Sequence, residues 1–254
     1  MSTGLAKRVI PTVLLDGDRL VKGVGFENYR EAGLAKTTLR VLNAQDPDEL
    51  LIVNISRTRK NFEIARGLIL EAINECDVPI AIGGGIRSLS DAKSYFHAGA
   101  EKVLLTSAIT QDFSLISDIT ETFGSQAVVA GIEYRERGGK RFRTRRNGSE
   151  FVGGDLENDI YSAQLSGAGE ILCVSVDRDG KKSGLDIDFL AKVSLSSPIP
   201  VIGMGGVGNF AHLVDGFVNG GLDAVACGTL FTFGDNNPIR ARAYLRNQEV
   251  TVRS

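Results

Sequence analysis

Apolar segments of strand length alternate with amphipathic segments of helical periodicity along the whole chain, and this alternation limits the possible folds most strongly. The segments with strand character are 8–15, 49–55, 79–83, 102–106, 127–133, 170–176, 200–203 and 223–227. Strands that are separated by helices pair in parallel through right-handed crossovers. Eight such strands in 254 residues predict a closed (β/α)8 TIM barrel. A doubly wound open sheet is the alternative, and it is disfavoured because no G-x-G-x-x-G follows the first strand.

The segments between the strands have apolar residues at helical spacing. Clear examples are 62–76 and 88–99. Ser90 and Asp91 are expected to open the second of these helices, and Gly99 is expected to end it.

An internal repeat supports the barrel. "PIAIGGGIRSLSDAKSYFHAGAEKVLLTSA" and "PVIGMGGVGNFAHLVDGFVNGGLDAVACGT" lie 121 residues apart, which places Gly84 on Gly205 and Glu49 on Glu170. A shift of 118 places Leu15 on Glu133. We therefore predict two similar half-barrels of about four βα units each. No low-complexity linker divides them, so residues 1–254 are treated as a single domain.

Composition excludes several classes of protein. The net charge of −2 gives no sign of nucleic-acid binding, and no apolar run is long enough to span a bilayer. The N-terminus has no signal-peptide core, and Cys76, Cys173 and Cys227 are widely spaced. We interpret them as reduced core residues of a cytoplasmic protein. His97 and His212 lie in helical patterns, so a histidine triad or metal site is not expected, and nothing indicates a cofactor.

Two glycine turns end strands and precede helices, at 83–85 and 205–206. Glycine lets backbone N–H groups approach an anion closely, and a helix N-terminus adds positive potential. In each half the next strand also ends in a small or polar residue. The repeat therefore predicts two phosphate sites on opposite sides of one mouth, and a substrate with a phosphate at each end. The alternative is that these glycines only make tight turns.

Several segments together resemble the cyclase subunit of imidazole glycerol phosphate synthase, the HisF family. They are "AKRVIP", "RLVKG", "GGGIRSLSDAKSYFHAGAEKV", "FGSQAVV", "GAGEIL", "DRDG", "GLDIDF" and "IPVIGMGGVG", in the family's order, from residue 5 to about 246. The resemblance implies a barrel that binds a bisphosphorylated ribonucleotide. It also implies a separate HisH-like glutaminase that docks at the barrel bottom and feeds ammonia through the centre to the mouth.

The resemblance assigns roles to individual residues. Lys22 matches the lysine of the mobile loop after the first strand, and Glu101 falls where the family has an aspartate facing the glutaminase. One phosphate site matches Gly84, Gly85 and Thr106, and the other contains Asp179, Gly180, Gly205, Gly206, Gly228 and Thr229.

A charged ring that gates ammonia entry matches Arg8, Glu49, Lys102 and Glu170. All four lie at strand starts, which is the bottom of a barrel, and two cations with two anions can satisfy one another where single charges would be costly. A purely stabilising salt-bridge cluster is the alternative.

The sequence departs from the family at the acid–base residues. The family uses two aspartates at equivalent strand ends, and we place the first on Leu15 and the second on Glu133. Leucine cannot transfer a proton. Asp16 and Asp18 are neighbouring substitutes, but a one-residue shift turns a strand side chain to the other face. Two further residues differ from the family. Asn54 replaces an aspartate at the mouth, and Met204 replaces a small residue beside the second phosphate site.

This pattern resembles a paralogous HisF-like branch, which has "VLLDGDRLVKG" and a basic "RKN" after the second strand. That branch is associated with surface-polysaccharide gene clusters and with conversion of a sugar acetamido group into an acetamidino group, which would make the substrate a phosphorylated small molecule or nucleotide-sugar. The alternatives are a working cyclase of histidine biosynthesis, which converts PRFAR and ammonia into imidazole glycerol phosphate and AICAR, and a non-catalytic barrel.

A basic run, "RERGGKRFRTRRNG" at 135–148, follows Glu133. It is interpreted either as a solvated hairpin or as a flap over an anionic ligand. Binding of nucleic acid is disfavoured because only Phe142 interleaves the charges.

Overall fold

The computed structural model describes residues 6–110, 112–145, 148–232 and 234–253. Over these residues, eight parallel strands follow one another around a closed barrel, in the order β10-β11-β12-β1-β4-β5-β6-β7, and β7 pairs with β10 to complete the circle. The barrel strands are β1 (Arg8–Asp16), β4 (Leu50–Asn54), β5 (Ile80–Gly83), β6 (Lys102–Leu105), β7 (Val128–Arg137), β10 (Glu170–Ser175), β11 (Val201–Met204) and β12 (Ala224–Cys227). The predicted (β/α)8 barrel is confirmed.

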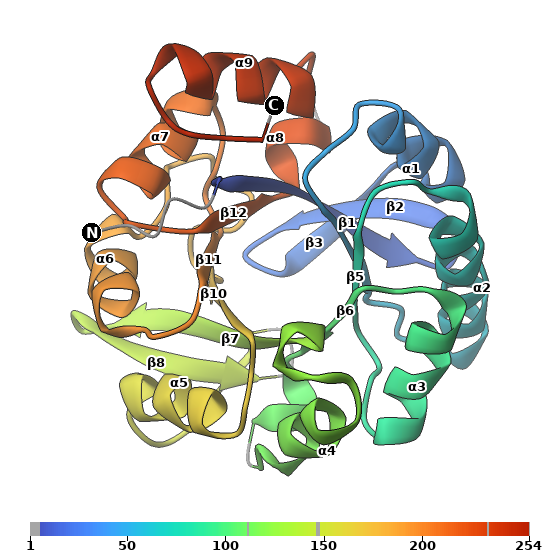
Figure 1. The fold of residues 1–254 in the computed structure, drawn as a ribbon, viewed down its shortest axis with the longest axis horizontal. Helices are drawn as coiled ribbons and strands as arrows, with labels where there is room; N and C mark the ends of the chain where they lie inside the picture. The colour runs from blue at the N-terminus through green and yellow to red at the C-terminus, as the bar shows by residue number, and fades with distance from the viewer. Residues whose placement is uncertain (1–5, 111, 146–147, 233, 254) are drawn as a thin grey trace.

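Helices surround the barrel, as the view along its axis shows (Figure 1). They are α1 (Ala35–Asn43), α2 (Arg59–Glu75), α3 (Leu89–Ala98), α4 (Ser114–Phe123), α5 (Leu156–Leu165), α6 (Ile187–Ser196), α7 (Phe210–Val218), α8 (Thr229–Thr232) and α9 (Pro238–Asn247), with 3-10 turns η1 (Ser107–Ile109) and η2 (Ser125–Ala127). Ser88, one residue before α3, accepts a hydrogen bond from the Asp91 backbone N–H, so Ser88 opens this helix where Ser90 and Asp91 were expected to. Gly99 ends it at a φ of 107°, as predicted.

Two antiparallel hairpins extend the barrel wall at its C-terminal end, which is the mouth. One is formed by β2 (Arg19–Val24) and β3 (Glu27–Leu34) after β1, and the other by β7 with β8 (Lys140–Arg145), to which β9 (Glu150–Phe151) pairs. The first hairpin crosses part of the barrel opening in the view of Figure 1. The resemblance implied a mobile loop after β1, and the hairpin stands in its place.

The strands divide the core into two clusters, because successive side chains of a strand point to opposite faces. The interior cluster contains strand residues such as Ile10, Leu51 and Val129. The outer cluster joins strand residues such as Val9 and Val13 to the helices. This alternation decides which strand-end residues can face a ligand. Within the described residues, no helix is long and apolar enough to cross a membrane.

Candidate active site

The first glycine turn opens on a large cavity at the mouth. Gly84, Gly85 and Thr106, which were predicted to form one phosphate site, all line it, and the carboxyl of Glu133 faces it from β7. Its volume is about 540 Å³, within the range of small-molecule sites. The structure therefore brings one predicted phosphate site and the predicted acid–base residue together.

Gly84 and Gly85 are required by space as well as by conformation. Their φ angles are 87° and 76°, and a Cβ on Gly84 would lie 2.0 Å from the Asn54 carbonyl oxygen. A Cβ on Gly85 would lie 2.3 Å from the Phe62 ring. Among the described residues, the backbone N–H groups of both glycines have no hydrogen-bond acceptor. The turn is thus a packing necessity that also leaves its donors free for an anion.

Glu133 is suited to exchange protons near neutral pH. Its side chain lies on the same face of β7 as that of Val129, which belongs to the interior cluster. Val129 comes earlier in the strand and so lies deeper in the barrel. Burial raises the pKa of Glu133 from 4.5 to about 7, against a smaller lowering by the charge of Arg143. A general acid or base is most effective when its pKa lies near the working pH.

The second glycine turn is closed in this conformation. A cavity of about 10 Å³ is lined by Asp179, Gly180, Met204, Gly205, Gly206, Val207, Ala226, Cys227, Gly228 and Thr229. This set contains all the residues predicted for the second phosphate site, but the volume holds at most about one water molecule. The two predicted phosphate sites are therefore built from matching turns and differ in the room they offer.

Lys22 and the β2–β3 hairpin account for this closure. The Lys22 ammonium lies 3.0 Å from a carboxylate oxygen of Asp179, and both side chains are about 5% exposed or less. The Gly25 backbone N–H donates to the Asp179 carbonyl oxygen at 3.0 Å. A Cβ on Gly180 would meet the Gly23 carbonyl oxygen at 2.5 Å. Lys22 thus contacts a residue predicted for the second phosphate site, and there it anchors the hairpin. It lies on strand β2, whereas the resemblance implied a mobile loop.

Tyr29 of β3 is a mouth residue that sequence analysis missed. Burial raises the pKa of its phenol to about 12, with contributions from the charges of Asp179 and Glu133, while Arg57 lowers it. The phenol is therefore within electrostatic range of residues on both sides of the mouth. The signal was absent from the sequence because the hairpin that carries Tyr29 was not predicted.

The placement of the first acid on Leu15 is wrong. Leu15 is fully buried in the outer cluster with Val9 and Val13, and so points toward the helices. Leu14 shares the face of Ile10, which belongs to the interior cluster, and pairs in register with Val53, a residue that lines the large cavity. Leu14 is therefore the β1 side chain directed at the mouth. It is equally aliphatic, so the described strand end still offers no acid there.

Asp16 and Asp18 do not replace that acid in this structure. Asp16 accepts a hydrogen bond from the Asn61 side chain at 2.8 Å, at the start of α2. Asp18 is exposed beside Arg19. The side chain of Asn54 donates to the Phe62 carbonyl oxygen and accepts from the Ser56 backbone N–H. Asn54 thus holds the loop after β4 and lines the large cavity.

The four predicted gate residues form a closed ring at the barrel bottom. Arg8 contacts Glu49 at 2.8 Å and Glu170 at 2.9 Å, and Lys102 contacts the same two carboxylates at 2.8 Å and 3.2 Å. Burial alone would lower the pKa of Arg8, but the charges of Glu170 and Glu49 raise it overall. Cations and anions alternate around the ring, so each charge has two opposite neighbours.

A small apolar void lies inside the barrel between the ring and the mouth. It measures about 10 Å³ and is lined by Glu49 together with Ile10, Leu51, Ala81, Leu104, Val129, Leu172, Ile202 and Ala226. Leu104 also lines the large cavity that contains Glu133. A molecule of the size of water or ammonia therefore has apolar walls between the ring and the mouth.

Glu101 is exposed next to Lys102 at the same end of the barrel, where the resemblance places the glutaminase. The side chain of Glu101 makes no hydrogen bond or ion pair with another described residue, so it is available to a partner protein. Its interface role stays a prediction.

Four arginines of the basic run after Glu133 are paired with acids of the same chain. Arg135 pairs with Asp177 at 2.9 Å and also donates to the Gly25 carbonyl oxygen of the β2–β3 hairpin. Arg141 binds both carboxylate oxygens of Asp186, at 2.6 Å and 2.7 Å. Further pairs join Arg143 to Asp159 and Arg145 to Glu150. These contacts favour the hairpin interpretation over a flap; residues 146–147 of the run lie outside the described residues.

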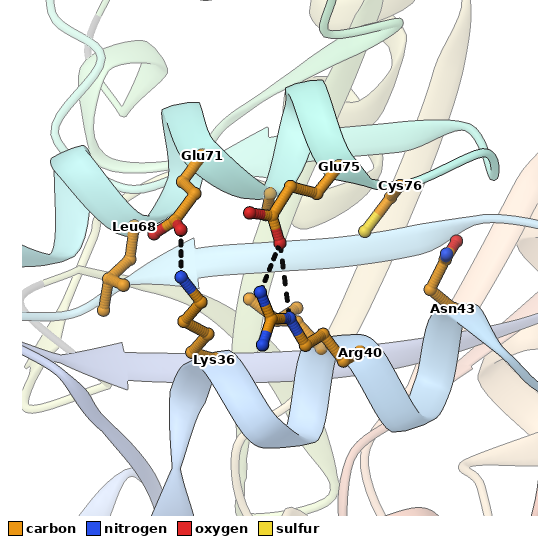
Figure 2. Close-up of a pocket in the computed structure, with 9 residues that line it drawn as sticks. Lys36, Arg40, Asn43, Leu68, Glu71, Glu75 and Cys76 are labelled. Carbon is orange, nitrogen blue, oxygen red and sulfur yellow. Dashed lines mark hydrogen bonds and ion pairs between the residues drawn. The ribbon is translucent and has the colours of Figure 1, made fainter.

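A small pocket between α1 and α2 lacks the features of a site. Figure 2 shows Lys36 and Arg40 of α1 facing Glu71 and Glu75 of α2. Its volume is about 30 Å³, and its four charged side chains form two mutual pairs. This groove is an exposed ion-pair ladder between two helices.

Comparison with known proteins agrees with this geometry. Residues 8–237 match the family described as "Histidine biosynthesis protein". The chain is 39% identical over 249 residues to "Imidazole glycerol phosphate synthase subunit HisF" of Pelodictyon phaeoclathratiforme, covering 98% of this chain and 99% of that protein. HisF of Chlorobium limicola has the same identity and coverage, and HisF of Chlorobaculum parvum is 37% identical over 249 residues.

Proposed function

Because this chain belongs to the histidine biosynthesis family and is a HisF-like subunit of the imidazole glycerol phosphate synthase type, we propose that it adds ammonia to an acceptor bound at the barrel mouth. The ammonia comes from a HisH-like glutaminase docked at the barrel bottom, where Glu101 and the charged ring lie. We place the protein in the cytoplasm, in keeping with its three free cysteines.

One observation carries this proposal: the ring, the apolar void and Glu133 lie in sequence along one barrel interior. Glu49 belongs to both the ring and the void, and Leu104 belongs to both the void and the cavity of Glu133. In the proposed reaction, ammonia passes the ring, crosses the apolar interior and meets the acceptor beside Glu133. Glu133 exchanges the proton, and the glycine turns hold the phosphates of the acceptor.

The relatives favour cyclase chemistry as the reaction at this site. They are HisF subunits matched over nearly their full length, which supports PRFAR as acceptor and imidazole glycerol phosphate and AICAR as products. The test is to supply the purified chain with PRFAR and ammonium ions, then with glutamine and a HisH-type glutaminase. Turnover in both assays supports the cyclase; turnover in neither contradicts it.

A second candidate acceptor is favoured by the apolar end of β1. With Leu14 at the mouth, Glu133 is the only carboxylate among the described residues that line the large cavity. Acetamidino formation on a sugar requires delivered ammonia and an activated amide, and it requires no ring closure. A product amidine formed with a nucleotide-sugar and an amidotransferase, together with absence of PRFAR turnover, would select this function in surface-polysaccharide biosynthesis.

Exchanging the two adjacent leucines of β1 for aspartate tests the assignment of the mouth face. We expect Leu14→Asp to fold and to raise cyclase turnover by about tenfold or more, because a positioned acid contributes about 10²–10⁴-fold. Leu15→Asp puts a carboxylate among helix-facing apolar side chains and should destabilise the barrel by about 3 kcal/mol or more. Urea unfolding and steady-state rates measure both. A gain of turnover in Leu15→Asp alone would contradict the assignment.

A further inference from the structure

Two arginines without an acidic partner stand at the rim of the large cavity. Arg57 follows β4 and Arg87 follows β5, and both line the cavity with Gly84 and Gly85. Both side chains are exposed, and neither guanidinium makes an ion pair or hydrogen bond with a described residue. Four arginines of the β7–β8 hairpin are, by contrast, paired with carboxylates: Arg135, Arg141, Arg143 and Arg145.

The two arginines occupy equivalent places in neighbouring βα loops. Arg57 directly precedes Thr58, whose side chain accepts from the Asn61 backbone N–H at the start of α2. Arg87 directly precedes Ser88, which caps α3 in the same way. Each helix N-terminus carries roughly half a positive charge. Two guanidinium groups and two helix N-termini therefore act on one cavity.

The acidic groups nearby leave this potential largely intact. Glu133 is the only acid among the described residues that line the cavity. Asp91 of α3 accepts hydrogen bonds from the Arg87 backbone N–H at 3.0 Å and from the Ser88 hydroxyl at 2.9 Å. That carboxylate is engaged with the loop and is absent from the cavity lining.

We propose that Arg57 and Arg87 form an anion clamp that receives a diphosphate group, so that the acceptor is held at this turn by two linked phosphates. The glycine turn with its free N–H groups accommodates one phosphate. A guanidinium binds phosphate oxygens in a bidentate manner, and two guanidiniums on separate loops match a second phosphoryl group. A single phosphate would leave one of them without a counter-ion in a cavity of about 540 Å³.

The clamp also sets the orientation of the ligand. The arginines lie on the loops at the rim, whereas Glu133 projects from β7 inside the barrel. A ligand held by its diphosphate at the rim extends its uncharged end toward Glu133 and the incoming ammonia. This inference rests on the proposed function for identifying the bound molecule as the ammonia acceptor. A linked diphosphate fits the nucleotide-sugar candidate, because the two phosphates of PRFAR lie at opposite ends of that molecule.

Isothermal titration calorimetry with inorganic phosphate and inorganic pyrophosphate tests the clamp without any turnover. We expect pyrophosphate to bind the whole chain at least about tenfold more tightly than phosphate, since its second phosphoryl group adds charge-assisted hydrogen bonds to the guanidinium groups. Arg57→Ala and Arg87→Ala should each weaken pyrophosphate binding by about tenfold or more. Lys60→Ala is the matched control, because Lys60 is an exposed cation in the first turn of α2 that does not line the cavity.

The outcomes separate this inference from the proposed function. Equal affinities for the two anions, or arginine variants that behave like Lys60→Ala, would overturn the clamp whether or not ammonia is used. Arginine-dependent pyrophosphate binding by a chain that uses no ammonia would uphold the clamp and refute the proposed function. Ammonia-dependent turnover with an unchanged KM in the Arg57→Ala/Arg87→Ala double variant would overturn the clamp and support the proposed function.

Discussion

Glu133→Gln should reduce ammonia-dependent turnover by about 10²–10⁴-fold while leaving KM within a factor of a few. The amide keeps the shape of the side chain but cannot accept or release a proton near neutral pH. In the wild-type chain, kcat/KM should change around pH 7, the pKa to which burial raises Glu133. The variant should lack that inflection. Rates measured from pH 5.5 to 9 with ammonia in excess provide the comparison.

The same substitution should stabilise the fold at alkaline pH. The folded-state pKa of Glu133 is raised from 4.5 to about 7, so between these values the folded chain binds more protons than the unfolded chain. The free energy of unfolding therefore falls as pH rises through this window. Glutamine removes that penalty, and Glu133→Gln should gain about 1–3 kcal/mol over wild type at pH 8 and close to nothing at pH 4.

Glu136→Gln is the control for both effects, because Glu136 lies on the same strand but is exposed. It should change neither turnover nor the pH dependence of stability. A Glu133→Gln variant with full activity and an unaltered pH profile would remove Glu133 from the proposed chemistry.

Glu49→Ala should have the second large effect, on stability and on the use of glutamine. The Glu49 carboxylate is 5% exposed and contacts Arg8 and Lys102, so its removal leaves two buried cations that share the single carboxylate of Glu170. Breaking a buried pair in this way costs about 3–5 kcal/mol. The opened ring should also lower glutamine-driven turnover relative to turnover driven by free ammonia, because delivered ammonia escapes.

Glu71→Ala is the matched control for this loss. Glu71 pairs with Lys36 across the α1–α2 ladder of Figure 2, and both side chains are exposed. Exposed pairs contribute little to stability, so no measurable change is expected. Guanidinium unfolding compares the free energies of unfolding of the three chains. An equal decrease in both variants would show that the ring contributes no more to stability than an exposed ion pair.

The barrel strands could be predicted from the sequence because they are buried on both faces and are therefore continuously apolar. The predicted 102–106 and 170–176 correspond to Lys102–Leu105 and Glu170–Ser175. The ring could be anticipated for the same reason, since its members lie at the starts of well-marked strands. Of the two hairpins at the mouth, the β7–β8 hairpin was one interpretation of the basic run, and the β2–β3 hairpin was not predicted. β3 is mostly exposed, and it has no clean alternation of apolar and polar residues.

The direction of a side chain at a strand end was harder to obtain than the strand itself. Leu14 and Leu15 are adjacent and identical, so only the pleat, fixed by pairing with β4 and β12, tells which faces the interior. Arg57 and Arg87 were also missed, because arginines before helices are usually solvated. The signal that could have found them is the repeated Arg before a Thr or Ser cap in two neighbouring loops.

The buried contact between Lys22 and Asp179 has a consequence for ligand entry. An anion that reaches the second glycine turn must replace Asp179 as counter-ion of Lys22 and detach the β2–β3 hairpin from the loop after β10. The affinity measured there therefore includes the free energy of opening this contact, and it equals the intrinsic affinity multiplied by the fraction of molecules in which the contact is already open. Asp179→Asn would weaken the contact with Lys22, and in such a chain we expect the second glycine turn to bind a phosphate more readily.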